Sequence, residues 1–475
     1  MYQSGLRYFN HDKKMGLKYA EMELYQLRNY ENAENVVRRE VLDYYINDKD
    51  GMLLLGDIFL EWGSDKDPRK LDEAYEVYSD IISLYGQKDP YLARLLRYYI
   101  RTDDLRNVLQ LKDYFYPRKK SLGGQDLVEL SGYLLDKVSG NIAPADEKLL
   151  VYIEDVRELL ERAVKLAPEI PESTYNMGLY FLNSKNYIPA KEWLLLSLDA
   201  FEKYPFRTKA RVLNHINAYR LLGDIGMEDE EYIEAEEFYR KGISLFEEEK
   251  AAGLQGNKNV GKLYASLGDL CYFITGDFDE ALKSYKVSVD TDNDTASIRY
   301  KMGYIYYTQK EYTEAVNAFI KTVEGKSNDT HALLALGNTL SIRGDNYAAQ
   351  GYYERLMVLL ENQRVRYNIM LPQVNEVHGD IVNVYLMASN NLGVTQYRLA
   401  QQIGDSSLNG EALANFTASL RAWDALTRNP ETMIRLPGSN LAERNIAYMT
   451  APLSEYEPAI YMEIPVMLEG EVFKR

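Results

Sequence analysis

The sequence is poor in the residues that metal sites and disulfide frameworks use. Its 475 residues include one cysteine, Cys271, and four histidines, His11, His215, His331 and His378. One cysteine cannot form an intramolecular disulfide, and we expect Cys271 to be a buried, unreactive thiol at a helix-packing position. The histidines are scattered without metal-ligand spacing, and no His-Glu-x-x-His motif or cysteine pair accompanies them. No metal site is predicted.

Basic residues are outnumbered by acidic ones. The 55 lysines and arginines face 72 aspartates and glutamates, which gives a formal net charge of −17. Nucleic acids and anionic membrane surfaces are bound by basic faces, so both kinds of partner are disfavoured. No run of about eighteen apolar residues is present, so no segment is predicted to span a bilayer. The acidic balance is compatible with a scaffold that resists aggregation.

Two stretches imitate ligand-binding loops without meeting their requirements. Gly325–Ser327 has the order Gly-Lys-Ser found at the end of a phosphate-binding loop, but Ile320 stands where the leading glycine is required. Asp290–Asp294 has the alternating aspartates of a calcium loop, but Thr295 replaces the turn glycine and Lys301 the bidentate glutamate. No nucleophile-elbow motif is present. We therefore expect no catalytic residues, no cofactor and no enzymatic activity.

What the chain does contain is one recurring spacing of small and bulky residues. A glycine preceded by an apolar residue is followed twelve residues later by alanine, and a bulky residue stands four positions beyond the alanine. The glycine and bulky residue of the regular instances are Gly178 and Leu194, Gly223 and Tyr239, Gly303 and Phe319, and Gly337 and Tyr353. Two further instances, Gly268 with Tyr285 and Gly393 with Phe416, contain one and seven extra residues. Gly303 and Gly337 are 34 residues apart.

This spacing resembles the signature of tetratricopeptide (TPR) repeats, in which each unit is a helical hairpin. The glycine lies on the first helix, and the alanine and bulky residue share one face of the second. We expect the small residues to let the two helices approach, and the bulky residue to fill space toward the next hairpin. One hairpin cannot bury its apolar stripe alone, so neighbours stack. The implied fold is all-α, a TPR superhelical solenoid of antiparallel helix pairs.

The repeats divide the chain into three predicted regions. Residues 1–145 are expected to form irregular TPR-like hairpins, among them the pair marked by Gly56 and Tyr78. Residues 146–430 are expected to form the regular superhelix with insertions. From residue 431 the helical period is lost, and 431–475 are predicted to be a non-helical, extended tail.

The tail shows alternation between apolar and other residues, with Pro458 and Pro465 within it. The pattern predicts an extended segment whose apolar side is Ile460, Met462, Ile464, Val466 and Leu468. Proline at 465 excludes a central strand. We expect the tail to dock, in an ordered way, on this chain or on a second copy.

The concave wall of a TPR superhelix is formed by the first helices, so their outward positions predict a binding groove. Tyr300, Tyr304 and Tyr307 form one continuous stripe, and tyrosine is enriched in binding hot spots. The residues predicted to line the groove are Tyr175, Asn183, Asn217, Arg220, Lys262, Tyr272, Tyr300, Tyr304, Tyr307 and Asn338. Two alternatives remain open: a solvated face, or tyrosines that the protein's own tail covers.

One TPR function is disfavoured on the residues of the same helices. Members that capture the acidic C-terminus of chaperones resemble one another in a lysine-asparagine carboxylate clamp at the fifth and ninth positions of the first helices. The pairs at those positions here include Arg220/Asp224, Ala265/Asp269 and Leu334/Asn338. None matches the clamp, so a co-chaperone role is not implied.

The whole chain also resembles the repeat domain of the spirochaetal periplasmic flagellar collar protein. The likeness lies in its hairpins rich in tyrosine and asparagine and in the ending from Leu441–Asn445 through Met467. It implies a periplasmic scaffold that recruits other collar subunits around the flagellar motor. The chain starts without an apolar signal region, so we expect either a fragment of a longer exported protein or a cytoplasmic protein.

The leading functional hypothesis is a non-catalytic scaffold for protein-protein interactions, an assembly component of a large complex. The alternative is a regulatory receptor that binds a short peptide or helix in the concave groove. A non-catalytic subunit of an enzyme complex is a third hypothesis. Self-association through the C-terminal tail is compatible with each of them.

Overall fold

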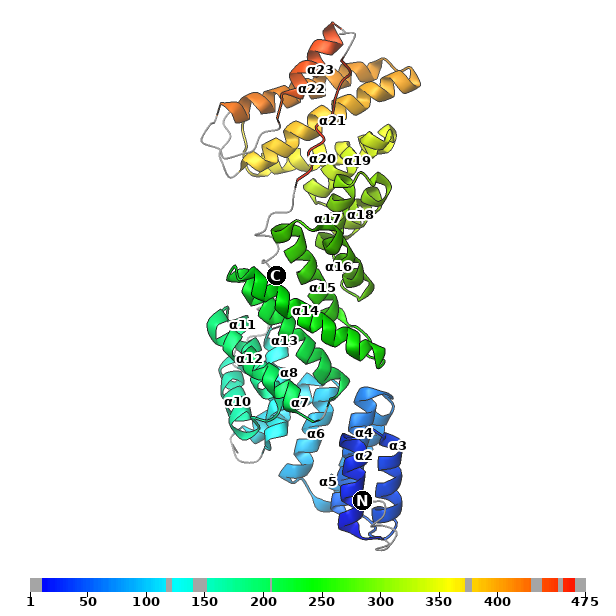
Figure 1. The fold of residues 1–475 in the computed structure, drawn as a ribbon, viewed down its shortest axis with the longest axis vertical. Helices are drawn as coiled ribbons and strands as arrows, with labels where there is room; N and C mark the ends of the chain where they lie inside the picture. The colour runs from blue at the N-terminus through cyan, green and yellow to red at the C-terminus, as the bar shows by residue number, and fades with distance from the viewer. Residues whose placement is uncertain are drawn as a thin grey trace. The chain divides into compact units, whose positions relative to one another are not determined.

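The structure is a computed structural model that describes residues 11–116, 122–139, 152–205, 207–371, 378–428, 438–451 and 456–465. The described residues are helical, joined by turns, and contain no β-strand. The chain divides into two compact units, Met1–Gln255 and Gly256–Arg475 (Figure 1). The boundaries predicted at 145 and 430 follow the regularity of the repeat and remain sequence-based predictions.

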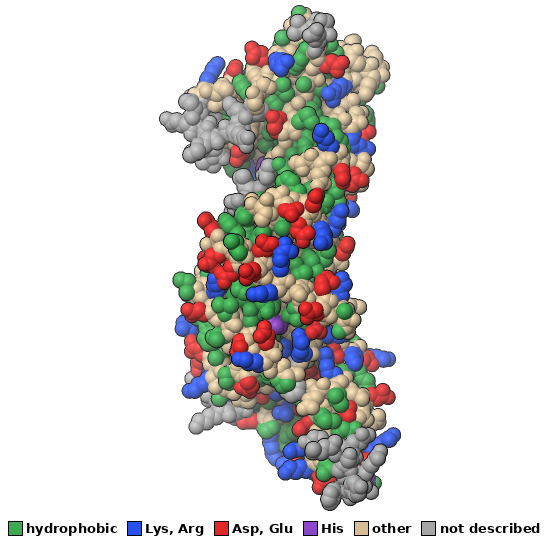
Figure 2. All heavy atoms as spheres, in the orientation of Figure 1, with side chains coloured by type: hydrophobic (Ala, Val, Ile, Leu, Met, Phe, Trp, Pro, Cys, Tyr) green, Lys and Arg blue, Asp and Glu red, His purple; other side chains and the backbone are tan. Residues whose placement is uncertain are grey.

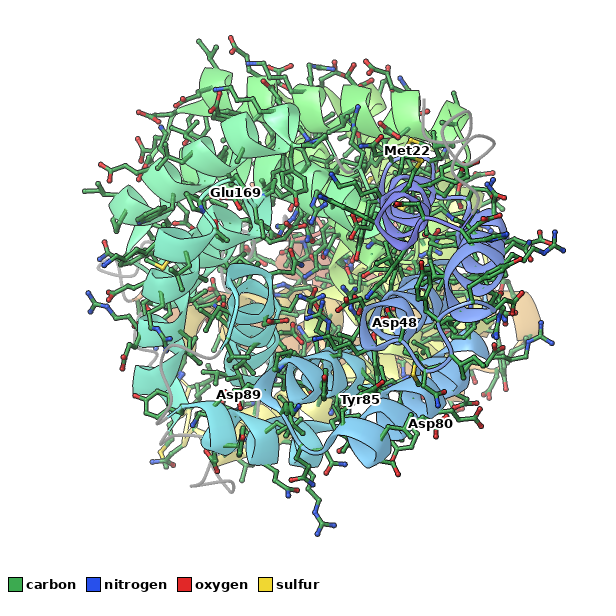
Figure 3. The ribbon with its side chains drawn as sticks, turned by 90° about the horizontal axis from the view of Figure 1, so that it is seen from below. Met22, Asp48, Asp80, Tyr85, Asp89 and Glu169 are labelled. Atoms are coloured by element: carbon green, nitrogen blue, oxygen red, sulfur yellow. The ribbon has the colours of Figure 1, made fainter. Side chains whose placement is uncertain are left out.

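The first unit consists of consecutive antiparallel helix pairs. In chain order they are α2 (Lys13–Tyr25) with α3 (Tyr30–Val36) and a π-helical turn (Val37–Leu42), α4 (Lys49–Asp65) with α5 (Lys70–Tyr85), α6 (Asp89–Arg101) with α7 (Leu105–Phe115), α8 (Gly124–Ser139) with α10 (Tyr152–Leu166), α11 (Pro171–Asn183) with α12 (Tyr187–Lys203), and α13 (Lys209–Glu228) with α14 (Tyr232–Ala251). Figure 3 shows this unit from below, with Tyr85 and Asp89 labelled where α5 ends and α6 begins.

The second unit continues the same pattern and adds one helix. It contains α15 (Lys258–Leu270) with its π-helical extension (Cys271–Thr275) and α16 (Phe278–Asp290), α17 (Ala296–Thr308) with α18 (Tyr312–Gly325), α19 (Thr330–Arg343) with α20 (Asn346–Arg366), α21 (Gly379–Ile403) with α22 (Ser407–Thr427), and α23 (Leu441–Thr450). Cys271 is buried, as expected. None of the described helices is long and apolar enough to cross a membrane.

Tight turns between paired helices contain a residue in the left-handed backbone region. Gly276, Gly344 and Gly404 have φ of 71°, 86° and 72°, and glycine adopts this conformation without steric cost. Lys185 and Lys310 occupy the same place with φ of 54° and 64°. The hairpin geometry therefore fixes the turn conformation even where the residue does not favour it.

The recurring glycine is required because an aromatic or leucine side chain rests directly on it. A Cβ built on Gly303 would lie 2.5 Å from Phe319 Cε1, and one on Gly178 would lie 2.7 Å from Leu194 Cγ. Both distances are far below van der Waals contact, so only glycine fits. The bulky residue therefore packs on the glycine of its own hairpin. Tyr285 also faces the next hairpin, as expected, because Lys301 Nζ of α17 lies 5.4 Å from the centroid of its ring.

The identity of the bulky residue is coupled to the residue that follows the glycine. Where the bulky residue is tyrosine, its hydroxyl donates to an aspartate or asparagine at that position. The donor-acceptor pairs are Tyr78–Asp57 (2.9 Å), Tyr239–Asp224 (2.9 Å), Tyr285–Asp269 (2.7 Å) and Tyr353–Asn338 (2.7 Å). Where it is Leu194, Phe319 or Phe416, the glycine is followed by Leu179, Tyr304 or Val394. A buried hydroxyl needs a partner, which explains the coupling.

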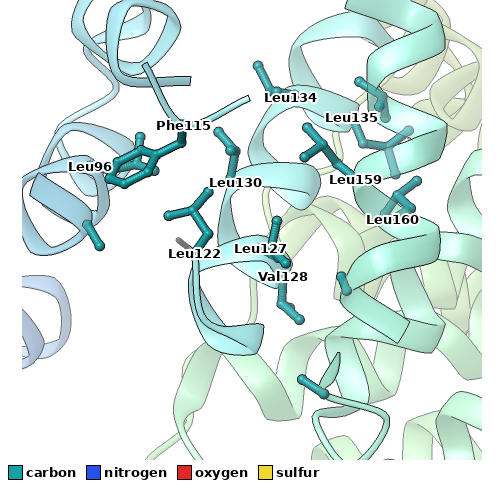
Figure 4. Packing of buried hydrophobic residues seen from close by; sticks show 14 of the residues in the cluster. Leu96, Phe115, Leu122, Leu127, Val128, Leu130, Leu134, Leu135, Leu159 and Leu160 are labelled. Atoms are coloured by element: carbon teal, nitrogen blue, oxygen red, sulfur yellow. The ribbon is translucent and has the colours of Figure 1, made fainter. Parts of the chain in front are cut away.

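Between the hairpins, apolar side chains form the core. In the first unit one cluster joins α6, α7, α8 and α10, where leucines of α10 face those of α8 (Figure 4). Acidic and basic groups are interspersed on the face that Figure 2 shows. A few charged side chains are buried, among them the ion pair of Lys301 with Asp269.

The region predicted to be a non-helical tail contains a helix, so that prediction was wrong for part of its length. α23 begins at Leu441, and Asn440 caps it by accepting a hydrogen bond from the Glu443 amide. Ala442 and Asn445 are buried, and Ile446 and Met449 pack against the cluster around Phe416. The spacing of these residues is helical, but the helix has only 10 residues, too few for the period to stand out.

Candidate functional site

The tail segment, residues 456–465, lies in the second unit against α17, α19, α21 and α23 (Figure 1). It has no regular secondary structure and runs as an extended ribbon. We call the side chains of α17, α19, α21 and α23 that contact it the wall. Hydrogen bonds from the wall reach the main chain of the tail segment, and three groups of residues make them.

Two asparagines each bind both main-chain polar groups of one tail residue. Asn391 of α21 donates to the Tyr461 carbonyl (2.8 Å) and accepts from the Tyr461 amide (2.7 Å). Asn445 of α23 does the same to Ala459, at 3.0 Å and 3.1 Å. A carboxamide carries a donor and an acceptor side by side, so it replaces the neighbouring strand that an extended backbone would otherwise need.

A third and a fourth asparagine supply further donors. Asn338 of α19 donates to the carbonyls of Tyr461 (3.0 Å) and Glu463 (3.2 Å). Asn390 of α21 donates to the Ala459 carbonyl at 3.0 Å. Asn338, Asn390, Asn391 and Asn445 are all fully buried, so each amide bond forms away from water, where an unmet polar group is costly.

The orientation of the Asn338 amide is fixed by the groups around it. Its Oδ1 accepts from the Tyr353 hydroxyl (2.7 Å) and from Asn391 Nδ2 (2.8 Å). Burial holds the pKa of the Tyr353 hydroxyl well above its usual value, so the hydroxyl stays protonated. Because Oδ1 is occupied by two donors, Nδ2 must point to the tail segment.

Two tyrosines of α17 complete the wall. The Tyr307 hydroxyl donates to the Met462 carbonyl at 2.6 Å, and the Tyr300 hydroxyl donates to the Pro465 carbonyl. Burial also raises the pKa of Tyr307, so this donor is neutral and protonated across the physiological range. Three of the predicted groove residues, Tyr300, Tyr307 and Asn338, therefore contact the tail segment.

The side chains of the tail segment follow the predicted alternation only in part. Pro458, Ile460, Tyr461 and Ile464 are buried, whereas Met462 is 51% exposed and Glu463 is exposed. Ile460 and Ile464 of the predicted apolar side are therefore buried, but Met462 of that side is not, and Tyr461 of the opposite side is. Val466 and Leu468, the other members of the predicted apolar side, lie outside the described residues.

Tyr461 is the most deeply enclosed side chain of the tail segment, with 1% exposure. Its hydroxyl accepts a hydrogen bond from the Leu441 amide at the start of α23 (2.9 Å). Burial raises the pKa of Tyr461 to about 12. The aromatic ring is thus removed from water, while its hydroxyl accepts a hydrogen bond at a helix N-terminus.

The remaining predicted residues of the second unit lie beside this site. Tyr304 is half-buried and meets Tyr272 edge-on, with ring centroids 5.8 Å apart. Tyr272 itself is buried, and its hydroxyl has no hydrogen-bond partner among the described residues. Lys262 is half-buried on α15.

The predicted residues of the first unit form an internal network. Asn217 donates to the Tyr175 hydroxyl at 2.6 Å, and Arg220 donates to Asn217 Oδ1 at 2.9 Å and to Asp224. Tyr175, Asn217 and Arg220 are buried. Asn183 is exposed at the end of α11.

The sequence analysis missed Asn390, Asn391 and Asn445. Asn390 and Asn391 sit in the middle of α21, within the buried stretch from Val384 to Gln396. Asparagine disfavours helix interiors, so a pair of them on an otherwise apolar helix must have buried partners. The unusual pair of asparagines in an apolar helix was visible in the sequence, although the segment that they bind was not.

No group of three or more His, Cys, Asp or Glu side chains among the described residues is arranged to hold a metal ion. What the site offers is neutral amide and hydroxyl donors and acceptors together with the apolar cluster that contains Ile460. These groups bind an extended polypeptide.

Comparisons with known proteins point to one repeat family. A family model described as a TPR repeat matches residues 271–310. The TPR repeat-containing protein MJ1428 of Methanocaldococcus jannaschii is 22% identical over 472 residues, which cover 94% of this chain and 74% of that protein.

Solved structures with the same kind of fold are similar to parts of the chain. The apo form of RapI covers 80% of this chain and 100% of its own, with a TM-score of 0.45 and 12% identity. The C-terminal part of a TPR repeat-containing protein from Cytophaga hutchinsonii covers 63% of this chain and 99% of its own, with a TM-score of 0.39 and 15% identity. The matched repeat, the repeat-containing relative and the helix pairs that close on a glycine all support a tetratricopeptide repeat protein.

Proposed function

We propose that the protein is an assembly scaffold that holds extended segments of other proteins on the wall of its second unit. TPR proteins serve in protein-protein interaction, and stacked helix pairs present long rows of side chains to a partner. The observation that supports this site is the tail segment, whose main chain is held by Asn338, Asn391, Tyr300 and Tyr307. These four side chains already have the geometry that a bound polypeptide needs.

The proposed setting comes from the resemblance to the spirochaetal periplasmic flagellar collar protein. It suggests that the partners are other collar subunits and that the protein works in the periplasm. The abundance of tyrosine and asparagine supports that likeness, because in the second unit both residue types hold the tail segment.

A site-specific cross-linking experiment tests the scaffold proposal. A photoreactive phenylalanine analogue replaces Tyr304, which is half-buried beside the wall, or Tyr347, which is 86% exposed on α20. We expect the Tyr304 position to yield one discrete cross-linked partner in cells and the Tyr347 position to yield none. Cross-links from Tyr347 alone would move the binding surface to the outer helices and contradict the proposal.

The compartment is tested separately, with the natural gene fused to alkaline phosphatase. This reporter is active only after export, because its disulfides form in an oxidising compartment. We expect an active fusion. An inactive fusion produced at normal abundance would place the protein in the cytoplasm, while leaving the scaffold proposal intact.

A second candidate function is a regulatory receptor for a short peptide. The main-chain hydrogen bonds of Asn391 and Asn445 favour it, because they do not depend on a particular side chain of the ligand. Replacing Tyr300, Tyr304 and Tyr307 together with alanine separates the two functions. Assembly that survives the loss of peptide binding favours the receptor, whereas loss of both favours the scaffold.

A further inference from the structure

The contact between the tail segment and the wall is built like a peptide complex. Helix pairs elsewhere in the chain interlock through apolar side chains, whereas the wall binds main-chain atoms at Ala459, Tyr461, Met462, Glu463 and Pro465. Main-chain hydrogen bonds supply affinity without sequence preference, and side-chain pockets at fixed intervals supply specificity.

Four buried side chains of the tail segment, those of Pro458, Ile460, Tyr461 and Ile464, supply that specificity. Ile460 packs in an apolar cluster with Val394, Ala412 and Phe416. The pocket of Tyr461 is the most selective, since it encloses the ring and also donates the Leu441 amide to the hydroxyl. Phenylalanine there would lose this hydrogen bond and leave the Leu441 amide only the Ser439 carbonyl (3.1 Å), which lowers affinity. The site therefore selects the pattern Pro-x-Ile-Tyr-x-x-Ile in an extended ribbon.

An unmet polar group lies beside Tyr304 of α17, in the π-helical extension of α15. The Tyr272 hydroxyl is buried without a hydrogen-bond partner among the described residues, and its ring touches Tyr304 of α17. A ligand that continued past Tyr300 toward α15 could offer a carbonyl to this hydroxyl. Such a ligand would make a contact that residues 456–465 do not make.

We propose that the wall is a binding site for an extended segment of a partner protein with the pattern Pro-x-Ile-Tyr-x-x-Ile, and that the chain's own tail segment is its resident, displaceable ligand. This inference rests on the proposed function and names the chemistry of the partner. A second copy of this chain is a weaker competitor, because it offers the same contacts while the tethered tail acts at an effective concentration of about 1 mM.

Displacement is tested on the full chain with a labelled peptide of the sequence of residues 456–465. In the wild type the resident tail competes with the labelled peptide for the wall. The apparent affinity for the peptide is therefore the intrinsic affinity multiplied by the fraction of sites that the tail leaves open. Tyr461→Ala removes the best anchor of the resident. We expect the labelled peptide to bind this variant at least tenfold more tightly than the wild type, measured by fluorescence anisotropy.

Two second-site variants locate the binding. Asn391→Asp, added to Tyr461→Ala, replaces the donor to the ligand's tyrosine carbonyl with a carboxylate and should lower peptide affinity at least tenfold. Asn317→Asp makes the same chemical change on the exposed face of α18 and should leave affinity unchanged. A peptide with alanine in place of the tyrosine that corresponds to Tyr461 should bind at least tenfold more weakly than the original peptide.

Circular dichroism first checks that Tyr461→Ala is folded, and Ile464→Ala is used in its place if it is not. Equal peptide affinity in the wild type and the tail variant would overturn the inference, as would insensitivity to Asn391→Asp. Sedimentation that shows tail-dependent dimers of the wild type would overturn it in favour of a second copy. The Tyr304 cross-link is independent of these results, so the scaffold proposal can survive the loss of this inference.

Discussion

Two hairpins, one in each unit, show how a single atom decides what a repeat position does. Asp224 in the first unit and Asn338 in the second both follow the repeat glycine, and both accept a tyrosine hydroxyl. Asp224 gives its other oxygen to Arg220, so the position is satisfied within its own hairpin. Asn338 has an NH₂ group in that place, and this group donates to two tail carbonyls. Exchanging an oxygen for a nitrogen turns a self-contained position into one that binds another segment.

The largest effect on stability is expected from replacing Asn338 by aspartate, the residue at the equivalent position 224. Asn338→Asp removes the donor to the carbonyls of Tyr461 and Glu463 and places a charge where the side chain is fully buried. We expect the free energy of unfolding of the second unit to fall by about 3–5 kcal/mol. Hydrogen exchange at the amides of residues 459–464 should accelerate at the same time.

The control for this variant is Asn317→Asp on the exposed face of α18, which should change the free energy of unfolding by less than about 0.5 kcal/mol. Unchanged exchange in the tail segment of Asn338→Asp would contradict the role assigned to the Asn338 amide, whatever happens to the global stability.

A second comparison uses acid, to which the two units should respond differently. His215 in the first unit is stacked between Phe201 and Tyr219, and burial, aided by the charge of Arg207, lowers its pKa to about 4. The unfolded chain binds this proton near pH 6.5, so stability is present above that pH and is lost as pH falls toward 4. The loss amounts to about 3 kcal/mol at most.

His215→Phe should abolish this part of the pH dependence, measured by urea unfolding at pH 7 and pH 4.5. The wall of the second unit uses neutral amides and phenols, so exchange in residues 459–464 should not follow the His215 titration. A pH dependence that persists in His215→Phe would assign it to other groups.

The third test concerns the glycine shared by the hairpins of both units. Gly303→Ala would place a methyl group 2.5 Å from Phe319 Cε1, between two packed helices. We expect a loss of about 1–3 kcal/mol from overpacking, measured by chemical denaturation. Gly351→Ala lies on the exposed face of α20 with nothing within 4 Å and should instead stabilise by about 0.5–1 kcal/mol.

The smallest effect tests the coupling between the bulky residue and its acceptor. Tyr285→Phe removes the hydroxyl that Asp269 accepts, but Asp269 keeps Lys301 as a partner, so we expect a loss of about 1 kcal/mol. The reverse change, Phe416→Tyr, adds a buried hydroxyl where Val394 follows the glycine. If both variants are as stable as the wild type in thermal denaturation, the coupling has no energetic basis.

The sequence was sufficient to predict the hairpins because the glycine-ring contact imposes a fixed spacing. Gly303 and Phe319 must meet across one turn, so their separation along the chain cannot drift. The TPR fold and several residues of the site followed from that register. Tyr300, Tyr307 and Asn338 were predicted as outward positions of first helices, and all three contact the tail segment.

The rest depended on contacts between distant segments, which spacing does not encode. Asn391 and Asn445 bind the tail segment across 70 and 14 residues, and neither belongs to the repeat signature. The alternation predicted for the tail holds at Ile460 and Ile464 but fails at Tyr461 and Met462, because asparagines hold the main chain at Ala459 and Tyr461 and leave Met462 facing solvent. Burial there follows the positions of the donors rather than the pleat of a strand.

The path of the tail segment has a consequence for how the second unit unfolds. Stacked repeats normally interact only with their neighbours, so a hairpin at one end can fray while the others stay folded. Residues 459–465 bind α21 first, then α19, then α17, and so connect hairpins that are not adjacent in the stack. Because one segment binds three hairpins, the opening of one hairpin weakens the hydrogen bonds between the tail segment and the other two. Removal of the tail segment would return this unit to the stepwise unfolding of a simple repeat array.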